Sequence, residues 1–187
     1  MNKLALALTV GSALLLTATA QASTGDSTYS GNTIYFVGEV VTETCQVDIN
    51  GNAESPIVML PSISAADLAS AGATAGETTF TLGISGCSGA AIKTQTRFIG
   101  NNVDAKGNLV PVDAGNSGYA GNVALQLLDA PGGNPLNLNS PVLVEGVTLA
   151  DGEKNGSAKY AVQYISVDGG ATPGIVTGSL QYSVTYN

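Results

Sequence analysis

The stretch Gly174-Ile-Val-Thr-Gly-Ser-Leu-Gln-Tyr-Ser-Val-Thr-Tyr-Asn187 decides the fold that we predict for this chain. The residues of one parity within it are apolar or aromatic: Leu180, Tyr182, Val184 and Tyr186. The residues between them are Gln, Ser and Thr. This period-2 alternation predicts a β-strand with one face in a core and the other in water. No hairpin partner follows in the sequence, so we expect one edge of the strand to be open or to be paired by a segment from elsewhere, in this chain or in another.

The first 22 residues have the three parts of a secretory signal peptide. Lys3 gives a positive start, Leu4–Leu16 is an apolar run, and Ala20-Gln21-Ala22 is an A-x-A cleavage site. The apolar run is shorter than the roughly 20 residues that a membrane span needs, which disfavours a membrane anchor. We therefore predict a signal peptide over 1–22, export, no membrane span, and a mature chain that starts at Ser23.

The charge of the mature chain excludes some classes of partner. Removing Lys3 from the 6 basic residues leaves 5, against 14 acidic residues, a net charge near −9. Such a chain is unsuited to nucleic acid or to an anionic membrane surface. Charged residues are only 11% of the sequence and apolar residues 44%. Neutral outer faces of this kind can pack against copies of themselves without desolvating many charges.

The chain has two cysteines, Cys45 and Cys87, and both lie in the exported part. A disulfide is the expected state of such a pair in an oxidising compartment. It would close a loop of about 42 residues (87 − 45) and contribute roughly 4 kcal/mol in the chain-entropy view. A reactive thiol pair is the weaker alternative, because the spacing is far from C-x-x-C and no histidine can activate a thiolate.

Short apolar or alternating segments at regular spacing predict an all-β chain. We expect strands at 33–49, 57–60, 78–85, 92–99, 122–128, 142–149 and 158–167, besides the C-terminal one. Residues 64–71 predict one or two helical turns, with Ser64 and Asp67 as a capping box. The Gly- and Asn-rich stretch 101–121 predicts a long loop with at most a short strand at 109–112. Together these features favour a single β-sandwich domain.

No catalytic or cofactor-binding motif is present in the sequence. Without histidine, a Ser-His-Asp triad or a His-bearing zinc site cannot form. Asp104-Ala-Lys-Gly-Asn lacks the spacing of a calcium loop, and Asn155-Gly156-Ser157 is as well explained by a turn as by N-glycosylation. Two carboxylates could still come together in the fold and form a hydrolase site, so a hydrolase stays a remote alternative. We therefore predict that the chain is not an enzyme and binds no cofactor and no metal.

Several motifs together resemble the type 1 fimbrial major subunits of the chaperone–usher pilin family. They are Val37-Gly38-Glu39-Val40-Val41 leading to Cys45, the second cysteine Cys87, Ala171-Thr172-Pro173-Gly174, and Tyr182-Ser183-Val184-Thr185-Tyr186-Asn187. The penultimate tyrosine and the glycine fourteen residues from the end are the most specific of these. The resemblance covers the mature chain, and the loop 101–121 matches it least.

The resemblance implies an incomplete immunoglobulin-like β-sandwich that lacks its final strand and is completed by donor-strand complementation and exchange. It implies a donor extension over 23–36 and a pilin domain over 37–187. The donor residues would be Tyr29, Gly31, Thr33, Ile34 and Phe36. The acceptor groove, which also binds a chaperone strand, would involve Gly174, Leu180, Tyr182, Val184 and Tyr186. Which face of the donor segment enters the groove stays open.

The same resemblance implies the function and the partners. The chain would be a structural subunit that polymerises by donor-strand exchange into a fimbria (pilus) used in cell adhesion. Its partners would be a periplasmic chaperone, an outer-membrane usher, copies of itself and neighbouring pilus subunits, on a route through the periplasm to the cell surface. A minor adapter subunit of the same pilus and an unrelated exported β-sandwich binding protein are the alternatives.

Overall fold

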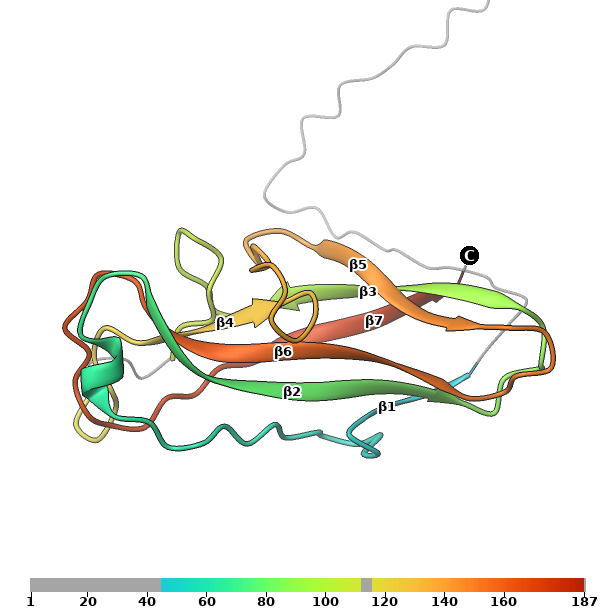
Figure 1. Ribbon diagram of the computed structural model, residues 1–187, viewed down its shortest axis with the longest axis horizontal. Coiled ribbons are helices and arrows are strands. Elements are labelled where there is room, and N and C mark those ends of the chain that lie inside the picture. Colours follow the sequence, from blue (N-terminus) through green and yellow to red (C-terminus); the bar gives the residue numbers. More distant parts are fainter. Residues whose placement is uncertain (1–44, 112–115, 187) are drawn as a thin grey trace, which may run out of the picture. The chain divides into compact units, whose positions relative to one another are not determined.

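A computed structural model of the protein describes residues 45–111 and 116–186 (Figure 1). Contacts between Cα atoms divide the chain into two units, Met1–Glu39 and Val40–Asn187. Every described residue belongs to the second unit. The predicted signal peptide and the predicted donor segment 23–36 therefore lie outside the described residues.

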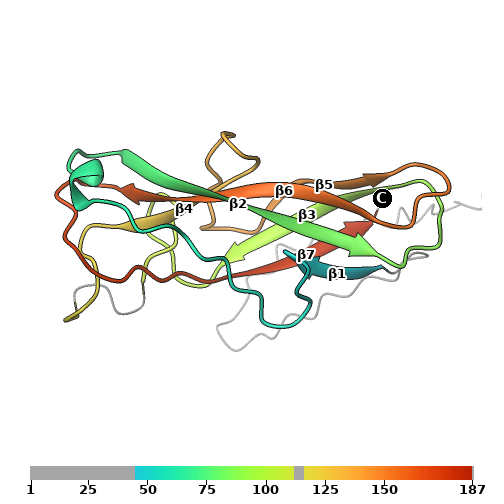
Figure 2. The same ribbon diagram turned by 60° about the horizontal axis from the view of Figure 1, so that its bottom comes forward.

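The described residues form two antiparallel sheets that lie against each other (Figures 1 and 2). The elements in chain order are β1 Gln46–Ile49, the short 3-10 helix η1 Ala65–Leu68, β2 Ala73–Ser85, β3 Ile92–Gly100, β4 Ala124–Leu128, β5 Val142–Leu149, β6 Gly156–Ser166 and β7 Leu180–Tyr186. One sheet has the order β1-β2-β6-β4 and the other the order β5-β3-β7. The predicted all-β sandwich is thereby confirmed.

The core lies between the two sheets and is built from the inward parity of each strand. On β2, the residues Phe80, Leu82 and Ile84 are buried as their alternation predicts. Tyr160 of β6 packs edge-on against Phe98 of β3, with ring centroids 5.1 Å apart. This aromatic contact joins the two sheets inside the sandwich.

The Tyr160 hydroxyl is the polar link through this core. It lies 2.6 Å from Thr96 Oγ1 on β3 and donates a hydrogen bond of 2.9 Å to the carbonyl oxygen of Glu145 on β5. Burial raises the pKa of Tyr160, and the hydrogen bond with Thr96 partly opposes this rise. A buried hydroxyl needs such partners, because leaving it unpaired costs about 1–3 kcal/mol.

The predicted helical turn forms as one short 3-10 helix. Its capping box is complete: Ser64 Oγ accepts from the Ala66 N–H at 3.2 Å, and Asp67 Oδ2 accepts from the Ser64 N–H at 3.3 Å. Leu68 is the residue of this turn that is buried. The reciprocal caps predicted from the sequence therefore fix where the chain turns before β2.

The predicted strand 57–60 does not form as a regular strand, and the stretch 109–112, for which at most a short strand is expected, shows only isolated bridges. Residues 57–60 alternate in burial but pair with no other described strand, and Leu109 makes isolated bridges to Val103 and Leu125 rather than a strand. The alternation of 57–60 shows that one face of the segment is buried. An extended segment with no strand partner gives the same pattern as a paired strand. Residues 112–115 lie outside the described residues. Of the predicted strand 33–49, residues 33–44 lie outside the described residues and 46–49 form β1. The remaining predicted strands form within about five residues of their predicted bounds.

Candidate functional site

β7 is an edge strand among the described residues. It pairs along its whole length with β3, from Leu180 opposite Gly100 to Tyr186 opposite Thr94, and with no other described strand. β1 is likewise the edge of the other sheet, where it pairs with β2. Both sheets of the sandwich thus present an edge on the side of β1 and β7, which Figure 2 brings forward.

A groove of about 280 Å³ lies at this side of the sandwich. Its deep part is formed by core residues of both sheets, among them Phe80, Phe98 and Leu127. All of its lining residues except Gly178 and Ser179 carry apolar or aromatic side chains. The groove is large enough for several side chains and offers mainly apolar contact.

One wall of the groove comes from the predicted acceptor strand. Leu180 and Tyr182 of β7 line it, and both are only half-buried. Val184 and Tyr186 share their parity and pack against the core, but do not line the groove. All four side chains pack against the core, as their alternation predicts, and two of them also line the groove.

The opposite wall is the extended segment 56–60. Pro56, Val58 and Leu60 line the groove and are half-buried. Ile57 also lines it but is exposed, and Met59 is exposed and does not line it. No backbone hydrogen bond joins this segment to any described residue. Backbone groups that pair with none of the described residues are ones that an incoming strand could satisfy.

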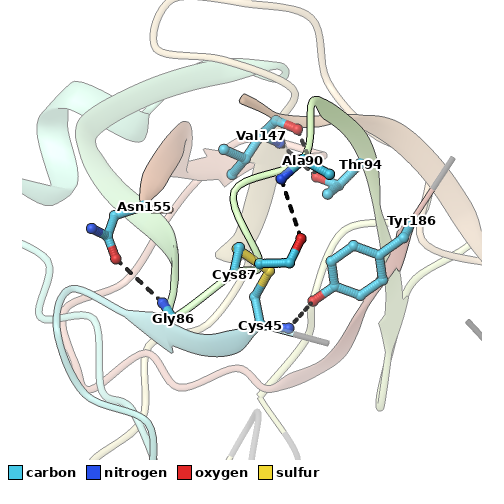
Figure 3. The surroundings of a disulfide bond; sticks show 9 residues. Cys45, Gly86, Cys87, Ala90, Thr94, Val147, Asn155 and Tyr186 are labelled. Atoms are coloured by element: carbon cyan, nitrogen blue, oxygen red, sulfur yellow. Dashed lines mark hydrogen bonds between the residues drawn. A yellow bond between two sulfur atoms is a disulfide. The ribbon is translucent and has the colours of Figure 1, made fainter. Parts of the chain in front are cut away.

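A disulfide and a hydrogen bond lie beyond the groove, where β7 ends and β1 begins (Figure 3). Cys45 and Cys87 are bonded, with their Cα atoms 4.7 Å apart, which confirms the predicted bridge. The Tyr186 hydroxyl accepts a hydrogen bond of 3.2 Å from the Cys45 N–H. The hydrogen bond joins the end of β7 to the residue before β1, and the disulfide ties that same residue to the segment that follows β2.

Gly174 lies away from the groove lining, before β7. A Cβ atom at this position would stand 2.2 Å from the backbone N of Ala120 and from the carbonyl carbon of Tyr119. The neighbouring Ile175 pairs in parallel with Tyr119 through two backbone hydrogen bonds. Gly174 therefore permits a close backbone contact that leads the chain into β7.

Sequence reasoning missed the residues that form the deep part of the groove. Leu109, Leu125 and Gly178 come from three distant segments and meet there. A Cβ at Gly178 would lie 3.1 Å from Leu109 Cβ and from Leu125 Cδ1. The alternation around Leu125 predicts burial, but no local signal shows that its burial is at a groove rather than in the closed core.

Residues 45–111 and 116–186 contain no group of three or more metal-ligating side chains. No helix in these ranges is long and apolar enough to cross a membrane.

The comparisons with known proteins agree with this architecture. The profile of the family described as "Fimbrial protein" matches residues 34–187. The type-1 fimbrial protein A chain of Escherichia coli K12 is 32% identical over 97% of both chains. The major fimbrial subunit SMF-1 of Stenotrophomonas maltophilia is 36% identical over 83% of this chain and 92% of that protein.

A solved structure shows the same fold. It is that of an antigen and type I fimbria protein of Burkholderia pseudomallei, which is 26% identical, covers 77% of this chain and 95% of its own, and superposes with a TM-score of 0.50. With the profile match and the two relatives, this places the chain in the family of fimbrial proteins, as a fimbrial subunit.

Proposed function

We propose that this chain is the major structural subunit of a surface fimbria and that it polymerises by donor-strand exchange. The observation that carries the proposal is the apolar groove between the β7 edge and the segment 56–60. Each copy would accept in this groove a strand from the next copy, and the sandwich of each copy would thereby be completed. The relative named a major fimbrial subunit, at 36% identity over 92% of its own length, is more similar than the one named a minor subunit, at 30% over 73%, which supports the major role.

The energetics of the groove support a strand as its occupant. An empty apolar cavity costs about 24 cal/mol per Å³, so 280 Å³ corresponds to at most about 7 kcal/mol. The net stability of a whole domain is about 5–15 kcal/mol. Filling the groove would therefore change the stability of the subunit by an amount comparable with its total.

The donor in this proposal is the segment 23–36 of the neighbouring copy, with Tyr29, Gly31, Thr33, Ile34 and Phe36 as its contact residues. The groove lining is almost wholly apolar, which favours the parity of Ile34 and Phe36 over the parity that carries Gly31 and Thr33. The domain that accepts the strand would be residues 37–187. Gly174, Val184 and Tyr186 would support the acceptor strand, while Leu180 and Tyr182 contact the donor.

The route to the cell surface is part of the proposal. The signal peptide 1–22 would direct the chain to the periplasm, where the Cys45–Cys87 disulfide can form. An exposed apolar groove beside an open strand edge is an aggregation hazard. A periplasmic chaperone would cover it until an outer-membrane usher brings the next subunit. The chain would act without catalysis and without a cofactor.

Addition of the donor strand as a separate peptide tests this function. A synthetic peptide of residues 23–36 should bind the mature subunit and raise its thermal unfolding midpoint, because a ligand that binds the folded state stabilises it. A scrambled peptide of the same composition is the control. If the two peptides act alike, or neither acts, donor-strand exchange is wrong. The copy number of the chain in purified fimbriae separates a major subunit from a minor adapter.

A further inference from the structure

The groove wall 56–60 presents an apolar surface on the side away from the core. The side chains of Ile57 and Met59 are 77% and 79% exposed. Among the described residues, four large hydrophobic side chains are exposed, and the two most exposed of them are Ile57 and Met59. We call Ile57 and Met59 the outer wall surface.

The outer wall surface is chemically suited to protein contact. No charged residue occurs in the sequence from Ser55 to Ala66, so the segment that carries this surface brings no charge of its own into a contact. Methionine is enriched at the cores of protein interfaces, and charged residues are depleted there. A single exposed apolar residue is ordinary, whereas two of them on a segment with no backbone pairing to the described residues suggest a contact surface.

The outer wall surface is continuous with the groove. Ile57 lines the groove and is exposed at the same time, whereas Met59 is exposed and does not line it. A strand seated in the groove can therefore touch Ile57 without covering Met59. Covering Met59 as well would take a second contact, made by the molecule that carries the strand.

The length of the segment between the donor strand and its own domain limits how far that domain can lie from the groove. If residues 23–36 of one copy occupy the groove of another, eight residues (44 − 36) separate the donor segment from Cys45, where the described domain of the donating copy begins. Eight extended residues span at most about 29 Å. The folded domain of the donating copy is thus held close to the groove and its walls.

We propose that the outer wall surface, Ile57 and Met59, binds the folded domain of the strand-donating copy. This inference rests on the proposed function, because it takes the donated strand as given. The contact lies outside the groove and between two folded domains. It would add to the affinity between copies without changing how the strand itself binds.

Substituting Met59 separates this contact from the groove. Met59→Gln keeps the length of the side chain and removes its apolar character, and Leu143→Gln is the matched control, at a side chain of β5 that is 54% exposed. Two quantities are measured on the full mature chain: the polymerisation rate, by light scattering, and the capture of a fluorescent peptide of residues 23–36, by anisotropy. The peptide carries no folded domain, so it cannot make the proposed contact.

Met59→Gln should slow polymerisation about tenfold, as expected for loss of most of a buried methionine contact, and change peptide capture less than about twofold. Leu143→Gln should change neither. The inference is overturned if Met59→Gln polymerises like the wild type, or if polymerisation and peptide capture fall together. Failure of the wild type to capture the peptide would instead overturn the proposed function, and this inference with it.

A photo-cross-linking residue at position 59 of assembled fibres provides a second measurement that does not depend on the substitution being tolerated. Cross-links to a second copy of the chain are expected. Cross-links to a chaperone before assembly, with none between copies in the fibre, would overturn the inference.

Discussion

The Tyr186 hydroxyl accepts a hydrogen bond from the Cys45 backbone N–H at 3.2 Å and so joins the end of β7 to the residue before β1. These two strands are the edges of different sheets. The Cys45–Cys87 disulfide ties the same residue to the chain segment after β2. The edges of the sandwich are thus linked beyond one end of the groove, while the groove itself stays open.

Removing the Tyr186 hydroxyl tests this link. Tyr186→Phe should lower the free energy of unfolding by about 0.5–1.5 kcal/mol, because the Cys45 N–H loses its acceptor. Urea denaturation measures the change. Tyr182→Phe is the matched control, since the Tyr182 hydroxyl makes no hydrogen bond to a described residue. Equal effects of the two substitutions would show that the hydrogen bond to Cys45 contributes nothing.

Loss of the disulfide should destabilise the subunit more strongly. The bridge spans 42 residues, so the variant Cys45→Ala/Cys87→Ala should lose roughly 4 kcal/mol of unfolding free energy. Reductant should shift the urea midpoint of the wild type towards that of the double variant and leave the double variant unchanged. A wild-type midpoint insensitive to full reduction would contradict the prediction.

Side chains of opposite parity on β7 should differ in their effect on donor binding. Leu180→Ala removes a side chain that lines the groove, and about 1.5–3 kcal/mol of apolar contact corresponds to a loss of peptide affinity of at least tenfold. Ser183→Ala, on the exposed face of the same strand, should leave the affinity unchanged. Titration of the 23–36 peptide measures both variants, and similar affinities for the two would place the donor elsewhere.

A side chain at position 174 should be poorly tolerated. In Gly174→Ala the new Cβ would meet the backbone at 2.2 Å, so the pairing of Ile175 with Tyr119 must open. We expect a loss of more than about 2 kcal/mol, from strain and broken hydrogen bonds. Gly132→Ala is the control, since no atom lies within 4 Å of the added Cβ and only its backbone conformation is unfavourable. A smaller loss at 174 than at 132 would refute the packing argument.

The buried Tyr160 should make the subunit sensitive to alkali. Burial raises the pKa of Tyr160 above its ordinary value of about 10, so the folded state binds this proton more tightly than the unfolded state. The resulting stability is fully present below pH 10 and is lost as pH rises through the folded-state pKa. Tyr160→Phe should be less stable at pH 7, because the hydrogen bonds to Thr96 and Glu145 are lost, but its stability should fall less between pH 10 and 12. Burial also raises the pKa of Tyr164, so some alkaline loss should remain in the variant.

The parity of the strands was predictable from the sequence because burial of one sheet face leaves a period of two. Phe80, Leu82 and Ile84 and the alternating residues of β7 are examples. The capping box of Ser64 and Asp67 was predictable because its two hydrogen bonds join residues three apart. The disulfide was predictable because the exported part of the chain has two cysteines.

The groove could not be read from local patterns. Leu109, Leu125 and Gly178 meet there from distant parts of the chain, and their own neighbours in sequence do not report it. Residues 57–60 were predicted as a strand because alternation records which side chains are buried and not whether the backbone is paired. The strong steric demand at Gly174 was also hidden, since it arises from the backbone of residues 119 and 120.

The central claim is that copies of this chain are joined by a donated strand in the groove, and the SDS resistance of unheated surface material tests it most directly. Fibres labelled by an antibody to this chain should give a ladder of multimers on SDS gels without heating, and a variant lacking residues 23–36 should give none. Labelled fibres that dissolve to monomers in cold SDS, or an unchanged ladder from the deletion variant, would contradict the account.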